Sequence, residues 1–437
     1  MASRVVISGI GTVANGGIGK EEFFQHIWSG RCNVMPVPAQ FTRSYPLRSR
    51  WYVPLPEFSL ADYGIKVPHE NIMQAADRMA VLGAKLALDD AGLAAVTAAG
   101  STKFAGLDRA GVILGAGLGS LRTALESNVC HCVPRDVLQA ALPERRVAFN
   151  RMVVPNTMPN SPAAWVSICF GLSGSCHTIN ASCASGTYAI GEAFRRIRDG
   201  YDSLLLAGGV ESFQDPDGFM MRGFDVLGVL THSADGLARP FSQKRSGFLF
   251  AEGGACVLVL EELRHALGRG AAICTEIADF RANSDATSIV QMDSTGAAIT
   301  RLLRELSSNR RIDYLNAHGT GTVANDPIEA DAIHAVFGEP TQQPLVNSTK
   351  GILGHTLGAS GAFEAAVTAL ALKRGTVHAN LTEDPIADLN LPLENVTGQI
   401  ENALSVSYGF GGHNGGLLLT RYEPASQGPA KSVPQPA

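Results

Sequence analysis

The feature that most restricts the fold of this chain is a series of short apolar runs separated by helical segments, which occurs twice in the same order. Continuous apolar runs that alternate with helices are typical of strands in a sheet covered by helices. The first series predicts strands at residues 4–10, 111–115, 176–181, 203–207 and 253–260. The second predicts strands at residues 273–280, 312–317, 345–348, 403–408 and 416–422, of which the last two form an antiparallel pair. The matching order predicts an α/β protein with two duplicated halves.

Local sequence signals predict one tight turn and one helix cap in this pattern. Gly9 and Gly11 follow a strand at the spacing of a dinucleotide-binding fingerprint, but no second strand ending in an acidic residue follows, so we interpret them as a tight turn. Asp326 is predicted to cap the helix that runs to residue 337, with Glu329 as its capping-box acid.

Composition excludes several function classes. The chain has 437 residues, a net charge of -5 and 17% charged residues, which fits a well-buried α/β protein and argues against a nucleic-acid binder. No apolar run approaches a membrane span, and the first residues lack the layout of a signal peptide, so we expect a cytoplasmic protein that does not engage membranes. Cys130, His131 and Cys132 have no second ligand pair at zinc-site spacing, and we expect no metal site there.

Cys183 is the first candidate for chemistry. It lies where the strand CHTINA ends and a helix begins, and that helix is predicted to stop at Gly200. Backbone N–H groups and the helix dipole at such a position favour a thiolate, and small neighbours such as Ala184 and Gly186 leave room for a substrate. The alternative is a buried structural cysteine, which is the commoner role for any single Cys.

Further candidates follow strands of the second half, where open α/β sheets place their sites. His318 opens the loop HGTGT, Lys350 and His355 lie in KGILGHTLGASG, and the glycine-rich turn 409–416 joins the last two strands. Each alone has a structural reading as a loop residue or a hairpin. One cysteine, two histidines and a lysine at comparable strand ends together indicate a shared site.

Five ordered segments carry a family resemblance: INASCASGTYAIGEA, RPFSQKRSGFLFAEGGA, NAHGTGTVANDPIEADAI, NSTKGILGHTLGASGAFEA and SVSYGFGGHNGG. They resemble the β-ketoacyl-[acyl-carrier-protein] synthases, in the elongating Cys-His-His branch of the thiolase-like fold. The resemblance implies a layered α-β-α-β-α architecture. Its halves would span residues 1–270, with the nucleophile, and 271–422, with the histidine pair, before a disordered tail at 423–437.

The resemblance also implies roles for individual residues. Cys183 would accept the growing acyl chain as a thioester, and His318 and His355 would hydrogen-bond the malonyl thioester carbonyl while the enolate forms by decarboxylation. Residues matching the supporting positions are Lys350 and Glu364, which orient the histidines; Phe410, which supplies an oxyanion-hole N–H and a gating side chain; and Thr320 and Thr322, which hold the phosphopantetheine arm. That arm belongs to the acyl carrier protein, and no cofactor of the chain itself is implied.

Departures from the family pattern leave the pathway open. His413 stands where Thr is common, Ser246 where Asp is, Asn325 where Gly is usual, and Gly228 where an Arg often meets the carrier protein. The residues in and around AHGTGT resemble polyketide ketosynthases more than fatty-acid enzymes, which favours a type II polyketide or polyene pathway over fatty-acid synthesis. Two alternatives remain open: a non-catalytic chain-length partner, and a thiolase, thioester hydrolase or decarboxylase of the same fold. We expect acyl and malonyl carrier proteins as partners, and a homodimer or a heterodimer with a same-fold chain-length subunit.

Overall fold

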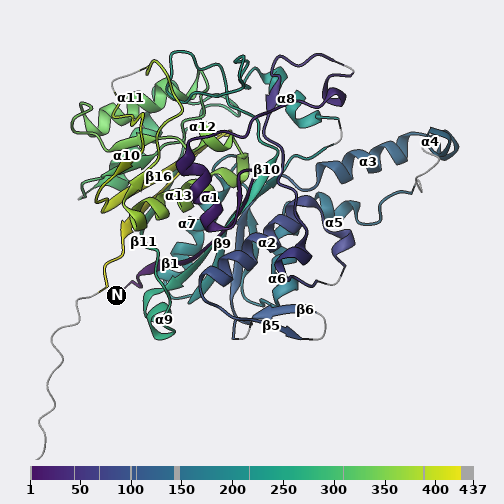
Figure 1. The fold of residues 1–437 in the computed structure, drawn as a ribbon, viewed down its shortest axis with the longest axis horizontal. Coiled ribbons are helices and arrows are strands. Elements are labelled where there is room, and N and C mark those ends of the chain that lie inside the picture. The colour runs from purple at the N-terminus through teal and green to yellow at the C-terminus, as the bar shows by residue number, and fades with distance from the viewer. Residues whose placement is uncertain are drawn as a thin grey trace, which may run out of the picture.

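The computed structural model describes residues 2–43, 45–67, 69–98, 101–104, 106–141, 148–215, 217–308, 310–386 and 389–424. Its two halves repeat one topology (Figure 1). The strands of the first half are β1 (Val5–Ala14), β7 (Gly111–Gly115), β8 (Cys176–Ile179), β9 (Leu204–Ser212) and β10 (Gly253–Glu262). Those of the second are β11 (Thr275–Ser284), β12 (Tyr314–Asn316), β13 (Leu345–Asn347), β16 (Asn402–Gly409) and β17 (His413–Arg421). Most of the expected tail, from residue 425 onward, lies outside the described residues.

Strand order is the same in both halves. The sheet runs β1-β10-β9-β7-β8 in the first half and β11-β17-β16-β12-β13 in the second, so each half has its first, fifth, fourth, second and third strands side by side. The second strand pairs in parallel with the third and fourth in each half, and the remaining pairs within each half are antiparallel. A short β1–β11 pairing at Val5–Ile7 joins the halves. This repetition agrees with the predicted duplication.

Helices form three layers around the two half-sheets (Figure 1). The central layer consists of α7 (Ser185–Arg198) and α13 (Ser360–Arg374), which contact each other and strands of both halves. On the outer faces, α2 (Ala75–Asp90) and α6 (Ser161–Phe170) cover the first half, and α10 (Ala297–Ser307) and α11 (Asn325–Phe337) cover the second. The arrangement is the α-β-α-β-α layering expected from the sequence.

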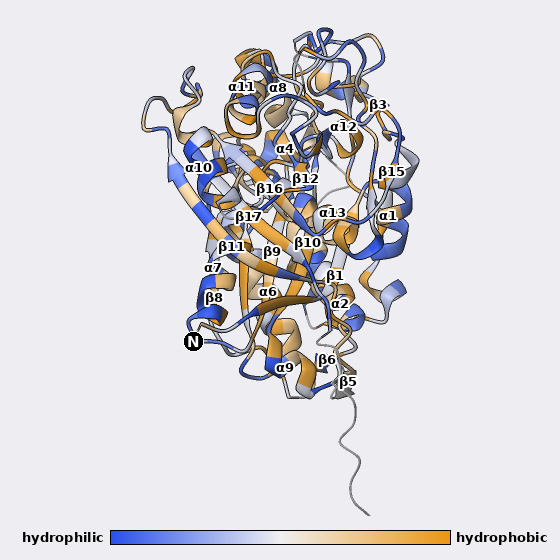
Figure 2. Ribbon diagram, turned by 90° about the vertical axis from the view of Figure 1, so that its left-hand side faces the viewer, coloured by the Kyte–Doolittle hydropathy of each residue, from blue (hydrophilic) through white to orange (hydrophobic). Residues whose placement is uncertain are grey.

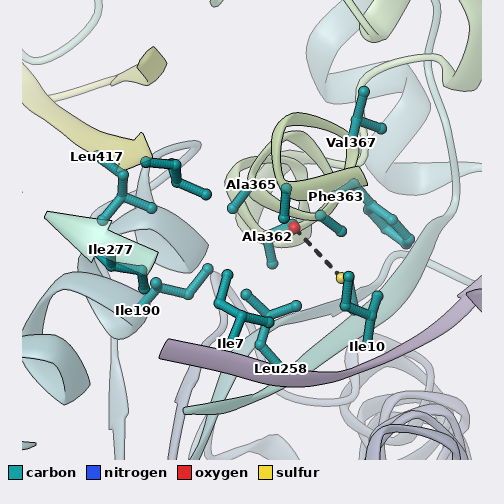
Figure 3. Close-up of a cluster of buried hydrophobic side chains, with 14 of the residues drawn as sticks. Ile7, Ile10, Ile190, Leu258, Ile277, Ala362, Phe363, Ala365, Val367 and Leu417 are labelled. Atoms are coloured by element: carbon teal, nitrogen blue, oxygen red, sulfur yellow. Dashed lines mark hydrogen bonds between the residues drawn. The ribbon is translucent and has the colours of Figure 1, made fainter. Parts of the chain in front are cut away.

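The core lies between these layers, where apolar colour is concentrated in the central strands (Figure 2). Figure 3 shows how Ile7 and Leu258 from the strands meet Ile190 of α7 and Phe363 of α13. The thiol of Cys256 also reaches the carbonyl oxygen of Ala362, 3.3 Å away. α13 is buried along its whole length up to Leu372, because sheet strands and α7 enclose it.

The remaining elements are short or peripheral. They are β2 (Gly17–Ile18), α1 (Lys20–Ser29), β3 (Met35–Pro36), β4 (Trp51–Tyr52), β5 (Ala95–Ala98), β6 (Ser101–Phe104), α3 (Leu121–Cys132), α4 (Arg135–Ala141), α5 (Val153–Thr157), α8 (Phe219–Leu227), α9 (Leu263–Gly268), α12 (Lys350–Leu353), β14 (Thr376–Val377) and β15 (Val396–Thr397). α3 and α4 extend away from the sheets as an arm (Figure 1). Among the described residues, no helix combines the length and apolar character needed to cross a bilayer.

The predicted tight turn at Gly9 and Gly11 is wrong. Both glycines lie inside β1, which continues to Ala14. A Cβ atom on Gly9 would lie 2.1 Å from the carbonyl oxygen of Ala87, and one on Gly11 would lie 2.0 Å from that of Gly83. The missing side chains therefore let α2 pack directly on the strand, which is a use of glycine that local sequence patterns do not distinguish from a turn.

The predicted capping box of α11 is also wrong. The helix has Ala324 at its N-cap and no side-chain cap. The carboxylates of Asp326 and Glu329 turn away from the helix end and accept backbone N–H groups of the loop that follows β12. That loop lacks regular backbone pairing, so long-range acceptors take the place of a local cap.

The strand that leads to Cys183 differs from its expected buried state. β8 is four residues long and pairs only with β7, at the outer edge of the first half. Cys176 is exposed, and His177, Thr178 and Ile179 are partly exposed. The apolar run thus predicted a strand correctly but not its edge position, which leaves backbone groups free to pair with another chain.

Candidate active site

Cys183 sits in a tight elbow between β8 and α7. Ser182 has a left-handed backbone with φ of 53°, and α7 begins two residues after the cysteine, at Ser185. The Ser185 hydroxyl accepts the N–H of Ala181 (2.9 Å) and donates to the carbonyl of Ser182 (2.6 Å). These bonds fix the elbow, since a non-glycine residue at positive φ needs such support.

Burial dominates the electrostatics of the Cys183 thiol. Its side chain is 5% exposed, and burial raises its pKa above the ordinary thiol value. The Ser182 hydroxyl, the Lys350 charge and the N–H of Phe410 act in the opposite direction. Desolvation thus opposes the thiolate that the start of a helix would favour.

The space expected beside Gly186 is also absent. A Cβ atom there would lie 2.8 Å from the backbone nitrogen of Ala362, so the glycine serves the close packing of α7 on α13. Aromatic side chains enclose the cysteine on the other side, in a buried cluster that includes Phe213, Phe248 and Phe250. Sequence analysis did not identify these aromatics as part of the site.

His355 contacts the thiol directly. Its Nε2 lies 3.2 Å from the Sγ of Cys183, and the N–H of Leu357 donates to its Nδ1 (3.2 Å). A ring nitrogen that accepts a backbone N–H carries no proton in a neutral imidazole, so the proton is on Nε2 and faces the sulfur. Ser360 Oγ also lies 2.9 Å from Nδ1.

His318 is held in the same tautomer by a different group. Lys350 Nζ lies 3.2 Å from its Nδ1 and 2.8 Å from its carbonyl oxygen, and pairs with the carboxylate of Glu364. An ammonium has donors only, so Nδ1 must accept and Nε2 carries the proton. The other Glu364 oxygen accepts the Ser407 hydroxyl (3.1 Å).

Both histidines are neutral hydrogen-bond donors. Burial, reinforced by the Lys350 charge, holds the pKa of His318 and that of His355 well below the ordinary range. Their ring centroids are 5.7 Å apart, and the planes cross at 85°. Two neutral Nε2–H groups beside one buried thiol can stabilise negative charge that develops on a substrate oxygen.

Two carboxylates that the sequence pattern assigned to a helix cap, Glu329 and Asp326, instead accept backbone N–H groups of the loop after β12. Glu329 accepts the N–H groups of His318 and Gly319, each at 2.8 Å. Asp326 accepts the N–H of Gly321 (3.1 Å). Burial raises the pKa of Glu329 to about 7. An acidic residue repeated at short spacing after a glycine-rich loop is the signal that could have identified this support.

The structure brings the predicted residues into one site. Phe410 lies in the turn between β16 and β17 and packs against the buried cluster that contains Cys183. Thr320 and Thr322 follow His318, and their hydroxyls lie 2.9 Å apart. Within the part of the chain that the structure describes, no cluster of His, Cys, Asp and Glu side chains is arranged to hold a metal ion.

Comparisons with known proteins find relatives that cover nearly the whole chain. Residues 2–266 match the family described as "Beta-ketoacyl synthase, N-terminal domain" and residues 274–383 match "Beta-ketoacyl synthase, C-terminal domain". The chain is 32% identical over 432 residues to 3-oxoacyl-[acyl-carrier-protein] synthase 2 of Coxiella burnetii, which covers 96% of this chain and 98% of that protein.

Solved structures of similar fold are also ketosynthases. The ishigamide ketosynthase/chain length factor matches with a TM-score of 0.80 and 26% identity, over 97% of this chain and all of that one. A type II polyketide synthase acyl-carrier protein in complex with its ketosynthase bound to the hexaketide gives the same four values.

Proposed function

This chain belongs to the β-ketoacyl synthase family, and from that premise we propose that it joins an acyl chain on Cys183 to malonyl carrier protein by decarboxylative Claisen condensation. Membership makes the chain an acyltransferase of the 3-oxoacyl-[acyl-carrier-protein] synthase type. The roles of its residues are derived below from this chain's own contacts.

The first half-reaction transfers the acyl chain. The Cys183 sulfur attacks the carbonyl carbon of the acyl carrier thioester, the carrier thiol leaves with the proton, and an enzyme thioester remains. The N–H groups of Phe410 and Cys183 would bind the oxyanion.

The second half-reaction makes the carbon–carbon bond. The malonyl group loses carbon dioxide, and its electrons form an enolate whose oxygen accepts hydrogen bonds from the Nε2–H groups of His318 and His355. The enolate carbon attacks the Cys183 thioester, the sulfur leaves, and the β-ketoacyl product remains on the carrier. Lys350 and Glu364 act through His318 by holding its Nδ1 as an acceptor.

The observation that carries this proposal is the pair of contacts that holds the ring of His355, from which the position of its proton follows. Its Nε2–H faces the Cys183 sulfur at 3.2 Å, because the N–H of Leu357 occupies Nδ1. In this tautomer Nε2 cannot accept the thiol proton, so His355 serves as a donor rather than as a base. A donor beside a buried thiol suits enolate formation better than thiol activation.

The two alternatives fit the site less well. A non-catalytic chain-length partner needs no nucleophile, whereas Cys183, His318 and His355 are in place here. A biosynthetic thiolase would carry a second reactive cysteine near the C-terminal glycine loop. The last cysteine, Cys274, instead lies near the carbonyl of Ala369 in α13, where burial raises its pKa to about 11.

We also propose the partners of this reaction. The acyl and malonyl groups arrive on a carrier protein, and Thr320 and Thr322 at the His318 loop are the hydroxyls that would hold its phosphopantetheine arm. Gly228, where an Arg was expected, ends α8 in a left-handed conformation with φ of 73°, so backbone geometry accounts for the glycine. The exposed edge of β8 suits pairing with a second copy or with a same-fold chain-length subunit.

Intact-protein mass spectrometry tests the function. We expect an acyl adduct on the wild-type chain and on Cys132→Ala, which removes an exposed cysteine, and no adduct on Cys183→Ala. A panel of saturated and polyunsaturated acyl carriers would distinguish a fatty-acid from a type II polyketide or polyene pathway, of which we favour the latter. A Cys183→Ala protein that still condenses would refute the nucleophile assignment.

A further inference from the structure

Glu211 is a buried carboxylate that the proposed reaction does not use. It lies near the end of β9, is 1% exposed, and accepts three backbone N–H groups from two loops. Its Oε2 accepts Gly117 (2.8 Å) and Gly358 (3.3 Å), and its Oε1 accepts Leu118 (3.2 Å). Burial raises its pKa to about 7. Such a group is costly to bury, and its partners show what it holds.

One of these loops supports the cysteine elbow. Gly117 follows β7, and its carbonyl accepts the side-chain N–H of Asn180 (2.8 Å). The Oδ1 of Asn180 in turn accepts the N–H of Ser182 (3.2 Å), the residue with φ of 53° that precedes Cys183. The carboxylate of Glu211 is thus linked through three hydrogen bonds, by way of Gly117 and Asn180, to the strained residue that precedes the nucleophile.

The other loop supports His355. Gly358 follows Leu357, which is also in a left-handed conformation, with φ of 51°. The N–H of Leu357 is the group that donates to His355 Nδ1 and places the ring proton on Nε2. By accepting the next N–H along the chain, Glu211 stabilises the backbone conformation on which that tautomer depends.

Two glycines make room for this carboxylate. A Cβ atom on Gly117 or on Gly358 would lie 2.5 Å from the Oε2 of Glu211, inside any normal contact distance. Neither residue has a positive φ, so backbone conformation does not explain the glycines. The close approach of the carboxylate explains both.

We propose that Glu211 is a positioning residue that fixes both sides of the active site, the Cys183 elbow through Gly117 and the His355 tautomer through Gly358. This inference rests on the proposed function for its kinetic consequence. Its structural consequence, the proton position on His355, does not depend on that function.

Histidine 15N NMR and steady-state kinetics test the proposal together on the full-length protein. In wild type we expect both His318 and His355 as Nε2–H tautomers. In Glu211→Leu, which keeps bulk without an acceptor, and in Gly358→Ala, whose methyl group excludes the carboxylate, His355 should become a mixture of tautomers. His318, held by Lys350, should not change and serves as the internal reference.

Kinetics should follow the same pattern. We expect kcat to fall about 100-fold in Glu211→Leu and about tenfold in Gly358→Ala, with KM for both carrier substrates within about twofold, because misplaced groups slow the chemical step more than docking. Glu211→Gln keeps an acceptor oxygen and should recover most of kcat. Glu261→Gln is the matched control, because Glu261 is equally buried but pairs with Arg269 and Ser8 outside the site.

Each outcome decides the proposal. An unchanged His355 tautomer in Gly358→Ala, or wild-type kcat in a folded Glu211→Leu, would overturn it, and so would an equal loss in Glu261→Gln. If Glu211→Leu does not fold, Gly358→Ala and Glu211→Gln carry the test. If the wild-type chain does not condense its substrates but the variants still change the His355 tautomer, the proposed function is rejected and the positioning role of Glu211 is retained.

Discussion

The loops that carry the two histidines reach the same result by different means. His318 owes its Nε2–H tautomer to a charged side chain, the ammonium of Lys350, which is paired with Glu364 in the core. His355 owes the same tautomer to a backbone N–H, that of Leu357, whose conformation is set by its neighbours in the loop. One tautomer therefore depends on a buried ion pair and the other on backbone geometry.

The difference determines how each side can fail. A buried ion pair can be broken by one substitution, which leaves its partner charge without compensation. A backbone donor cannot be removed by changing a side chain, except to proline, and it fails only if the loop moves. Single substitutions in the ion pair beside His318 should therefore lower activity strongly. Substitutions near His355 should have little effect unless they change the residues that hold its loop in place.

The largest expected effect is on the charged side. Lys350→Met removes the donor to His318 Nδ1 and leaves Glu364 buried without its partner. We expect kcat to fall by about 100-fold or more, and the free energy of unfolding to fall by about 3–5 kcal/mol. Steady-state condensation assays and chemical denaturation measure the two quantities.

A double variant separates these two losses. In Lys350→Met with Glu364→Gln, the unpaired charge is gone, so we expect most of the unfolding free energy to return while kcat stays low. If kcat returned with the stability, His318 would not need its ammonium donor, and the contrast between the two histidines would fail.

A second, smaller effect should appear in the reactivity of the thiol. Burial raises the pKa of Cys183, so its alkylation by iodoacetamide should keep accelerating as pH rises above the range of an ordinary thiol. His355→Ala removes the N–H that faces the sulfur and should slow alkylation at pH 8 about tenfold, because the thiolate loses a donor.

His318→Ala is the matched variant for that measurement. The sulfur has no hydrogen bond to His318, so we expect its alkylation rate to stay within about twofold of wild type. Peptide mapping by mass spectrometry isolates Cys183 from the other cysteines. If both variants slowed alkylation equally, both histidines would act on the thiol. That result would contradict the contacts, in which only His355 reaches the sulfur.

The smallest effect is expected at Ser360, whose hydroxyl is the side-chain partner of His355 Nδ1 among the described residues. Ser360→Ala leaves the N–H of Leu357 in place, so kcat should stay within about threefold and the free energy of unfolding should fall by about 1 kcal/mol. Ser407→Ala is the counterpart on the charged side, because Ser407 donates to Glu364, and there we expect a loss of about 1–3 kcal/mol. A larger effect at Ser360 would contradict the role assigned to the backbone.

The candidate site residues could be found in the sequence because each lies at a detectable boundary. Cys183, His318 and Lys350 all follow apolar runs. The order of those runs predicted an α/β protein with two duplicated halves, and the family resemblance implied its layers. A strand end is visible in the sequence, because hydrophobicity changes there. The residue types then limited the chemistry.

What escaped prediction depends on three-dimensional approach. Gly9 packs against a helix 78 residues later in the chain, and Glu329 supports a loop rather than its own helix. No local pattern distinguishes the use of Gly9 from a turn, because its partner in α2 lies far along the chain. Glu211 could have been noticed, since an acidic residue at the end of the apolar run SLLLAGGVE is as unusual as His318 after its strand.

The repeated strand order places two residues of the site at equivalent positions in the two halves. Cys183 lies between the third strand of its half and the central helix α7, and His355 lies between the third strand of its half and the central helix α13. The nucleophile and the donor that faces it are thus counterparts within the repeat. The two loops that meet at the Cys183 sulfur therefore hold the same place in the repeated topology but present different side chains to it.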